Sequence, residues 1–223
     1  MAALIIAHRG GAPEFEENSR AAFESGIENG ADMLEVDVLR TADGVLIARH
    51  NEMVSLPAGG QLRVSEAPFD LLQQTLPSLL PVEEFLERFG TRMRTNIDVK
   101  APGFERQLVR MLRRFDVTDQ VLVSSTLGRS LRRIKFLAPE MTCGLSRGQI
   151  VPWLGREPYS TIAADILRPT LPLQLPPHGR YALAGAFMLH YRLIRPWLVR
   201  SLHRSGFPVV CWTVHAPNAA RQP

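Results

Sequence analysis

The stretch MLEVDVLRTADGVLIARHN, residues 33–51, decides the fold, because it places two acids inside a strand that is otherwise apolar. Side chains two apart in a strand point to the same side, so Glu35 and Asp37 share one face and the Leu and Val residues around them share the other. Neighbouring carboxylates cost on the order of several kcal/mol by repulsion and desolvation unless a cation neutralises them. The pattern therefore indicates a divalent metal.

A second predicted strand, TNIDVK at 95–100, repeats the arrangement with Asp98 and Lys100 on one face. Three carboxylates with no histidine or cysteine close in sequence suit a hard ion, Mg²⁺ or Ca²⁺, better than zinc. In a chain whose other basic residues are almost all arginine, Lys100 indicates that a compact charge is needed there. The alternative is a row of charges that faces solvent on an edge strand.

Two histidines follow predicted strands. In AHRGG, residues 7–11, His8 and Arg9 precede two glycines, where the backbone can approach a ligand closely, and arginine suits a phosphate. The TADG segment, residues 41–44, is long enough for a hairpin but too short for a parallel crossover, so His50 returns to the region of the acids. Each histidine alone is more often structural, but together with the acids they indicate an active site.

Short β-rich runs alternate with helical stretches, which predicts an α/β fold on a parallel sheet. The predicted strands lie at 4–8, 32–38, 95–100, 121–125, 142–146, 187–191 and 209–214. The predicted helices lie at 18–30, 78–90, 126–139 and 194–206. The proline-rich residues 151–180 show no clean period, which predicts a long surface connection with a short helix near 160–167.

Length and composition, 223 residues of which 45% are hydrophobic and 22% charged, indicate one soluble globular domain, residues 1–223. The net charge is +4, and basic clusters such as MLRRF and LRRIK indicate solvated helix faces rather than a nucleic-acid site. The start MAALIIA is too short for a signal peptide, and no run has the ~20 apolar residues of a membrane helix, which predicts a cytoplasmic protein. Cys143 and Cys211 lie in apolar runs and are expected to be buried thiols.

These motifs, in this order, resemble the glycerophosphodiester phosphodiesterase family. The family signature runs His-Arg-Gly, Glu-Asn-Thr, Glu-x-Asp, a His-Asp after a short hairpin, and Glu-x-Lys. The sequence has HRG at 8–10, ENS at 17–19, EVD at 35–37, HN at 50–51 and DVK at 98–100. Residues 121–139 are similar to the family's Ser-Phe strand with its helix, and residues 206–214 to its Trp-Thr-Val strand, so the resemblance covers nearly the whole chain.

The resemblance implies a TIM-type (β/α)8 barrel with the active site at the C-terminal ends of the strands. The implied reaction is hydrolysis of a glycerophosphodiester to glycerol 3-phosphate and an alcohol, with one divalent cation, Mg²⁺ or Ca²⁺. Which histidine is the acid and which the base stays open. The implied roles are metal ligands for Glu35, Asp37 and Asp98, general acid and base for His8 and His50, and substrate contacts for Arg9, Glu17, Asn18 and Lys100, with Glu17 holding Arg9.

The sequence also departs from the family pattern. Asp98 stands where the family has glutamate, and Asn51 where it has the acid after the second histidine. If the TADG arm is a hairpin, the barrel has about seven parallel strands, and the chain stops at HAPNAARQP, residues 215–223, where the family continues. We therefore expect a C-terminally truncated barrel that lacks its last helix and strand and leaves an open edge.

Three functions are consistent with the sequence. The first is a metal-dependent phosphodiesterase that acts on a small-molecule glycerophosphodiester and has no nucleic-acid partner. The second is a truncated, non-catalytic member that binds anionic ligands or self-associates, as a homo-oligomer that covers the open edge. The third is a phosphodiesterase that cleaves lysophospholipids.

Overall fold

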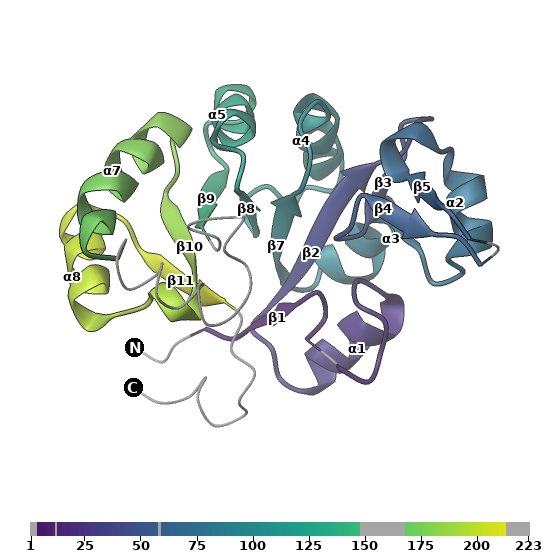
Figure 1. Ribbon diagram of the computed structural model, residues 1–223, viewed down its shortest axis with the longest axis horizontal. Coiled ribbons are helices and arrows are strands. Elements are labelled where there is room, and N and C mark those ends of the chain that lie inside the picture. The colour runs from purple at the N-terminus through teal and green to yellow at the C-terminus, as the bar shows by residue number, and fades with distance from the viewer. Residues whose placement is uncertain (1–3, 12, 58, 148–167, 213–223) are drawn as a thin grey trace.

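The computed structural model describes residues 4–11, 13–57, 59–147 and 168–212. Seven parallel strands form a curved sheet, and helices cover its outer side (Figure 1). In sheet order the strands are β1 (Ile6–His8), β2 (Met33–Arg40), β7 (Arg94–Val99), β8 (Val121–Ser125), β9 (Thr142–Arg147), β10 (Ala186–His190) and β11 (Val209–Trp212). All seven strands lie where the sequence predicted them, within a few residues.

The helices on the outer side follow the strands in chain order. They are α1 (Arg20–Glu28), α3 (Val82–Phe85) with the π-helical turn η2 (Leu86–Gly90), α4 (Glu105–Arg114), α5 (Gly128–Leu137), α7 (Leu171–Ala182) and α8 (Pro196–Arg204). Ser19 caps α1, because its hydroxyl accepts a hydrogen bond from Ala22 N at 3.2 Å. Pro196 occupies the first turn of α8, as predicted.

A hairpin arm extends the C-terminal half of β2. The strand β3 (Leu46–Ala48) runs antiparallel to β2 and pairs Ala48 with Val38, which confirms the predicted hairpin. The arm continues through shorter elements, and its own apolar cluster includes Ile47 and Val54. These elements are β4 (Met53–Ser55), β5 (Gln61–Arg63), η1 (Val64–Glu66), α2 (Phe69–Thr75) and β6 (Leu80–Pro81).

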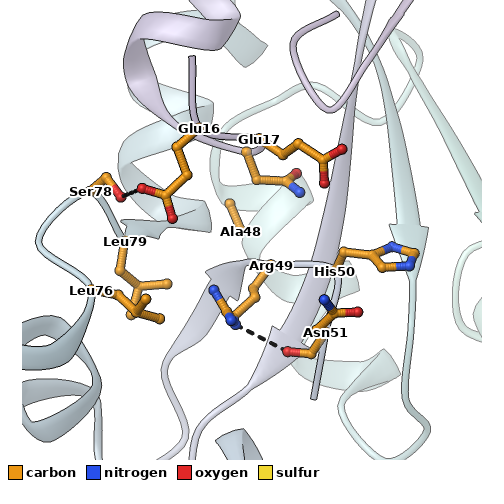
Figure 2. Close-up of a pocket in the computed structure, with 10 residues that line it drawn as sticks. Glu16, Glu17, Ala48, Arg49, His50, Asn51, Leu76, Ser78 and Leu79 are labelled. Carbon is orange, nitrogen blue, oxygen red and sulfur yellow. Dashed lines mark hydrogen bonds between the residues drawn. The ribbon is translucent and has the colours of Figure 1, made fainter. Parts of the chain in front are cut away.

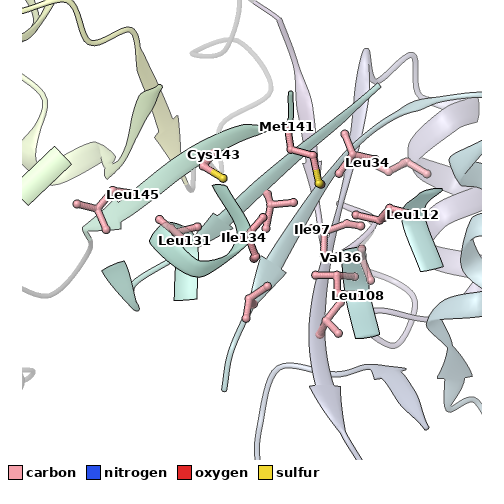
Figure 3. Close-up of a cluster of buried hydrophobic side chains, with 14 of the residues drawn as sticks. Leu34, Val36, Ile97, Leu108, Leu112, Leu131, Ile134, Met141, Cys143 and Leu145 are labelled. Atoms are coloured by element: carbon pink, nitrogen blue, oxygen red, sulfur yellow. The ribbon is translucent and has the colours of Figure 1, made fainter. Parts of the chain in front are cut away.

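The core lies between the sheet and the helices. Val36 and Ile97 point outward from adjacent strands and pack with Leu108 of α4 and Ile134 of α5 (Figure 3). Because side chains alternate along a strand, the residues between them point to the inside of the sheet. The inner side of β2 and β7 therefore carries Glu35, Asp37 and Asp98, which is the predicted division of apolar and acidic faces.

Three sequence predictions need correction. Residues 80–81, expected in a helix over 78–90, are the strand β6, and α3 begins at Val82. Residues 171–180, expected in a surface connection, belong to the helix α7, because Leu171, Leu175 and Ala182 give it a buried apolar face. Cys143 is buried as predicted, but Cys211, which lies on the edge strand β11, is exposed.

The two edge strands of the parallel sheet approach each other without pairing. In the described part of the chain, β1 pairs only with β2 and β11 only with β10. The rings of His8 and Trp212, at the ends of these strands, have centroids 6.2 Å apart. The predicted short helix at 160–167 and the chain end at 215–223 lie outside the described residues. No described helix is both long enough and apolar enough to cross a bilayer.

Candidate active site

Three carboxylates meet at the C-terminal ends of β2 and β7. Asp37 pairs in register with Asp98 of the neighbouring strand, and Glu35 lies two residues earlier on the same face. One oxygen from each of the three residues lies within 4.8 Å of the others, and all three residues are buried. The structure thus brings together the three residues predicted to hold a metal.

Two cations contact these carboxylates. Lys100 Nζ lies 2.7 Å from Asp37 Oδ1 and also contacts Asp98. Arg9 spreads its guanidinium over three partners: Nη1 lies 2.7 Å from Glu17 Oε2, Nε 3.0 Å from Asp37 Oδ2, and Nη2 3.2 Å from His50 Nε2. The contact with Glu17 is the one expected from the sequence.

His50 joins the site from the hairpin arm. Its Nδ1 lies 3.1 Å from Asp37 Oδ2, and its Nε2 faces the Arg9 guanidinium. A carboxylate only accepts hydrogen bonds and a guanidinium only donates them, so the partners select the neutral tautomer with the proton on Nδ1. The short hairpin thus places His50 as predicted, with its Nε2 lone pair toward Arg9.

Asn18 fixes the position of Asp37. Its Nδ2 donates to Asp37 Oδ2 at 3.1 Å, and its Oδ1 accepts from Asp37 N at 3.0 Å. Asn18 is buried and has a φ of 62°, a conformation that asparagine tolerates better than most residues. In this structure Asn18 therefore supports a carboxylate.

His8 enters the site from β1. Its register partner on β2 is Glu35, and Arg9 N donates a 2.7 Å hydrogen bond to Glu35 Oε2. Burial, followed by the positive charge of Arg9, lowers the pKa of His8 to about 4. Gly10, with a φ of 95°, lets the chain turn directly after these residues.

The carboxylates differ in how well they are neutralised. Burial raises the pKa of Asp37, but the His50 hydrogen bond and the charges of Lys100 and Arg9 outweigh it and hold that pKa well below its usual range. Burial, then the negative charges of Asp37 and Asp98, raises the pKa of Glu35 well above its usual value. Glu35 is therefore the group whose negative charge the described protein residues leave least compensated.

The residues present fit a hard divalent cation. The candidate ligands are all carboxylates, and two oxygens on opposite sides of Ca²⁺ are about 4.6–5.2 Å apart, so a spread of up to 4.8 Å is suitable. Counted without the exposed Glu17, the three buried carboxylates against Arg9 and Lys100 leave one negative charge. A divalent cation would make the site positive by one charge, which complements a phosphodiester anion.

Other polar residues of the site were not singled out from the sequence. Ser124, at the end of β8, donates to Asp98 Oδ1 at 2.8 Å. Trp212 packs edge-on against His190 with ring centroids 5.1 Å apart, and its buried Nε1 has no hydrogen-bond partner among the described residues. Strand alternation could have shown that Ser124 faces inward, but its contact with Asp98 depends on the register between β7 and β8.

A cavity of about 180 Å³ opens beside His50 (Figure 2). Its wall includes Glu16 and Glu17 from the loop before α1 and Arg49 from the end of β3. Arg49 donates from Nε to Asn51 O at 3.1 Å, and the Glu16 carboxylate accepts from the Ser78 hydroxyl. The remaining lining residues are Asn18, Ala48, His50, Asn51, Leu76, Ser78 and Leu79.

Comparison with known proteins gives the family. The model of the glycerophosphoryl diester phosphodiesterase family matches residues 8–222, which include every candidate site residue described above. The chain belongs to this family. The predicted family and the predicted class of enzyme are thereby confirmed.

Relatives and solved structures of the family agree. A glycerophosphodiester phosphodiesterase from Caldanaerobacter subterraneus is 32% identical over 182 residues, which cover 72% of this chain and 75% of the relative. The crystal structure of a glycerophosphodiester phosphodiesterase from Agrobacterium tumefaciens has a TM-score of 0.74 at 18% identity and covers 99% of this chain and 90% of that one. A phosphodiesterase from Oleispira antarctica, solved with the product sn-glycerol-3-phosphate, has a TM-score of 0.72 at 19% identity. The match covers 98% of this chain and 87% of that one. At these identities the solved structures show the fold, which confirms the predicted TIM barrel.

Proposed function

We propose that this family member hydrolyses glycerophosphodiesters to glycerol 3-phosphate and an alcohol, with Mg²⁺ or Ca²⁺ held by Glu35, Asp37 and Asp98. The observation that carries the proposal is the buried group of three carboxylates, with two cations and His50 in contact with Asp37 and His8 in register with Glu35. The name and the product complex of the relatives described above support the same reaction.

Arg9 and Lys100 bind the phosphodiester in this proposal. Both already contact Asp37, so each is held in place before the substrate arrives, which lowers the cost of organising the transition state. A metal at the carboxylates would supply further stabilisation of negative charge on the phosphoryl oxygens. Glu17 orients Arg9 through the 2.7 Å ion pair.

His8 and His50 move the protons. One of them takes a proton from the attacking group, and the other protonates the leaving alcohol. Asp37 holds the Nδ1 proton of His50, so Nε2 is the atom of His50 that exchanges protons. Burial keeps His8 neutral at pH 7 in the protein described here.

The cavity beside His50 is the proposed site of the alcohol. Its volume of about 180 Å³ is below the roughly 300–1,000 Å³ of pockets for drug-sized ligands, and charged side chains line it. These properties suit a small polar alcohol, such as a phospholipid headgroup.

The first test is glycerol 3-phosphate release from glycerophosphocholine and glycerophosphoethanolamine by purified protein. We expect release with Mg²⁺ or Ca²⁺, and loss of release with EDTA or in the Glu35→Gln variant. Lysophosphatidylcholine provides a further arm, and a preference for it would replace glycerophosphodiesters by lysophospholipids as the substrate. A folded protein that releases product from none of these substrates would refute the proposed reaction.

The two histidine roles can be separated with leaving groups of different acidity. The His8→Ala and His50→Ala variants would be compared on an alkyl diester and on a p-nitrophenyl diester of glycerol phosphate. A nitrophenolate leaves without protonation, so loss of the general acid should matter much less on that substrate. Equal impairment of both variants on both substrates would contradict the acid–base pair.

A further inference from the structure

Charge is unevenly divided along the chain. Residues 1–100 carry 16 acidic and nine basic side chains, a net charge of −7, whereas residues 101–223 carry six acidic and 17 basic side chains, a net charge of +11. The modest overall charge of +4 therefore conceals two parts of opposite sign. The active site uses the acidic part for its metal ligands, and the described site gives no role to most of the basic side chains.

The basic side chains of the second part gather on adjacent helices. α4, α5 and α7 lie side by side on the outer side of the barrel (Figure 1). Within these three helices the one acidic residue is Glu105, which is buried. We call their exposed side the basic helical face, and its exposed arginines are Arg106, Arg110, Arg113, Arg114, Arg129, Arg132, Arg133 and Arg180.

Most of this charge is not consumed by ion pairs. Arg113 pairs with Glu140 at 2.9 Å, Arg114 pairs with Glu83, and Arg133 lies 3.9 Å from the Glu105 carboxylate. Three further arginines, Arg106, Arg110 and Arg129, form no ion pair or hydrogen bond with any described residue. The basic helical face therefore presents a surplus of positive charge to its surroundings.

Large apolar side chains project from the same face. Phe136 is 86% exposed, and at about 100° per residue it lies within about 60° of Arg129, Arg132 and Arg133 around α5. On α7, Leu173 is 79% exposed and Tyr181 51%. Contact of these apolar side chains with water is unfavourable, so their burial against a partner would be favourable.

Arg132 links α5 to α7. Its Nη1 donates to Tyr181 O at 3.2 Å, and its guanidinium lies over the Tyr181 ring at 5.5 Å from the centroid. Tyr181 of α7 is thus joined to the arginines of α5.

We propose that the basic helical face docks on an anionic lipid bilayer. Arginines attract anionic headgroups, and apolar side chains among them enter the boundary between headgroups and acyl chains. The charge of the face complements such a surface, and the acidic part of the chain disfavours docking through the opposite side. Leu173 favours lipid over nucleic acid, because an aliphatic side chain cannot stack on bases.

The docking does not depend on the reaction proposed above. The catalytic residues lie at the C-terminal ends of the strands, whereas the basic helical face is the outer side of the helices (Figure 1). A protein bound in this way would work beside a membrane, where phospholipid breakdown releases glycerophosphodiesters.

The test is flotation of the full chain with vesicles of phosphatidylcholine alone or mixed with phosphatidylglycerol. We expect binding to the mixed vesicles only, and weaker binding as ionic strength rises from about 0.01 M to about 0.15 M. The triple variant Arg106→Gln, Arg110→Gln and Arg129→Gln should bind on the order of 100-fold more weakly, since each surface arginine contributes about fivefold. Phe136→Ala should weaken the binding that persists at the higher ionic strength.

A matched control carries the same change of charge elsewhere. Arg40→Gln, Arg63→Gln and Arg94→Gln remove three exposed arginines from the acidic part and should leave vesicle binding unchanged. Thermal unfolding of each variant verifies that it is folded. The proposal is overturned if the control loses as much binding as the first triple variant, or if vesicles of pure phosphatidylcholine are bound equally well. It is also overturned if the protein binds neither kind of vesicle but shifts an RNA oligonucleotide in a gel.

Discussion

Glu35 is the residue at which the proposed metal binding and the stability of the metal-free protein conflict most. It is buried beside two other carboxylates, and its only described hydrogen bond is from Arg9 N. In the proposed Glu35→Gln variant the amide oxygen can keep that hydrogen bond while the negative charge is removed. We expect activity to fall by about 10³-fold, because metal stabilisation of charge contributes several kcal/mol. The metal-free variant should be about 1–2 kcal/mol more stable than wild type, because a buried, unpaired charge is gone.

Thermal unfolding with EDTA and with excess Mg²⁺ or Ca²⁺ provides the measurement. An ion at a hundredfold excess over its dissociation constant stabilises the folded protein by about 2.7 kcal/mol, and the variant should lose most of this gain. The metal assignment would be wrong if neither ion stabilised wild type, or if both proteins gained equally.

Arg9 tests whether guanidinium geometry matters beyond charge. Its three nitrogens contact Glu17, Asp37 and His50, and a lysine ammonium cannot span all three. We therefore expect Arg9→Lys to lower kcat/KM by about 10–100-fold. Arg20→Lys, which alters an ion pair with Glu84 outside the site, serves as the control and should leave kcat/KM unchanged. Steady-state kinetics on both variants would contradict the role of Arg9 if they showed equal rates.

The contact between β1 and α1 sets the place of His8. A Cβ on Gly10 would lie 2.6 Å from the backbone and Cβ of Ala22, and Gly10 has a φ of +95°. Gly10→Ala should therefore lower the free energy of unfolding by about 2–4 kcal/mol through overlap and strain. Gly30→Ala isolates the strain, because Gly30 has a φ of +78° but no atom within 4 Å of its Cβ position, and it should cost about 1 kcal/mol.

Chemical denaturation of the two glycine variants gives the comparison. The surviving folded Gly10→Ala protein should also lose activity, because His8 and Arg9 directly precede the displaced turn. Equal stability losses at both positions would show that the close approach of Gly10 to α1 contributes nothing.

Elements with a local signal could be predicted from the sequence, and α7 could not. Alternation of apolar and acidic residues predicts the strand at 33–40. The four-residue TADG turn is also a local feature, and it is enough to bring His50 back to Asp37. In α7, Pro176 and Pro177 oppose a helix locally. The helix forms because it packs closely on the sheet: a Cβ at Gly179 would lie 2.8 Å from the rings of Phe187 and Phe207. These two partners lie outside the helix, so no local sequence pattern includes them.

At the scale of the whole molecule, the approach of β11 to β1 brings the two ends of the sheet together. His8 and Trp212 face each other across this approach, and Trp212 also packs on His190. Trp212→Ala should lower the free energy of unfolding by about 2 kcal/mol, because a half-buried aromatic side chain is lost, and should reduce kcat/KM by loosening His8. Cys211→Ser changes the adjacent, exposed residue on the other face of β11 and should alter stability by less than about 0.5 kcal/mol.

Denaturation curves and kinetics on these two variants separate closure of the barrel from a purely local effect. If Trp212→Ala reduced stability but left kcat/KM intact, the indole would support β10 and β11 without positioning His8. If both measurements fell while Cys211→Ser behaved as wild type, side chains would be joining strands whose backbones do not pair in the described chain. The barrel would then depend at this junction on the same residues that form its active site, so changes that impair catalysis here should also weaken the fold.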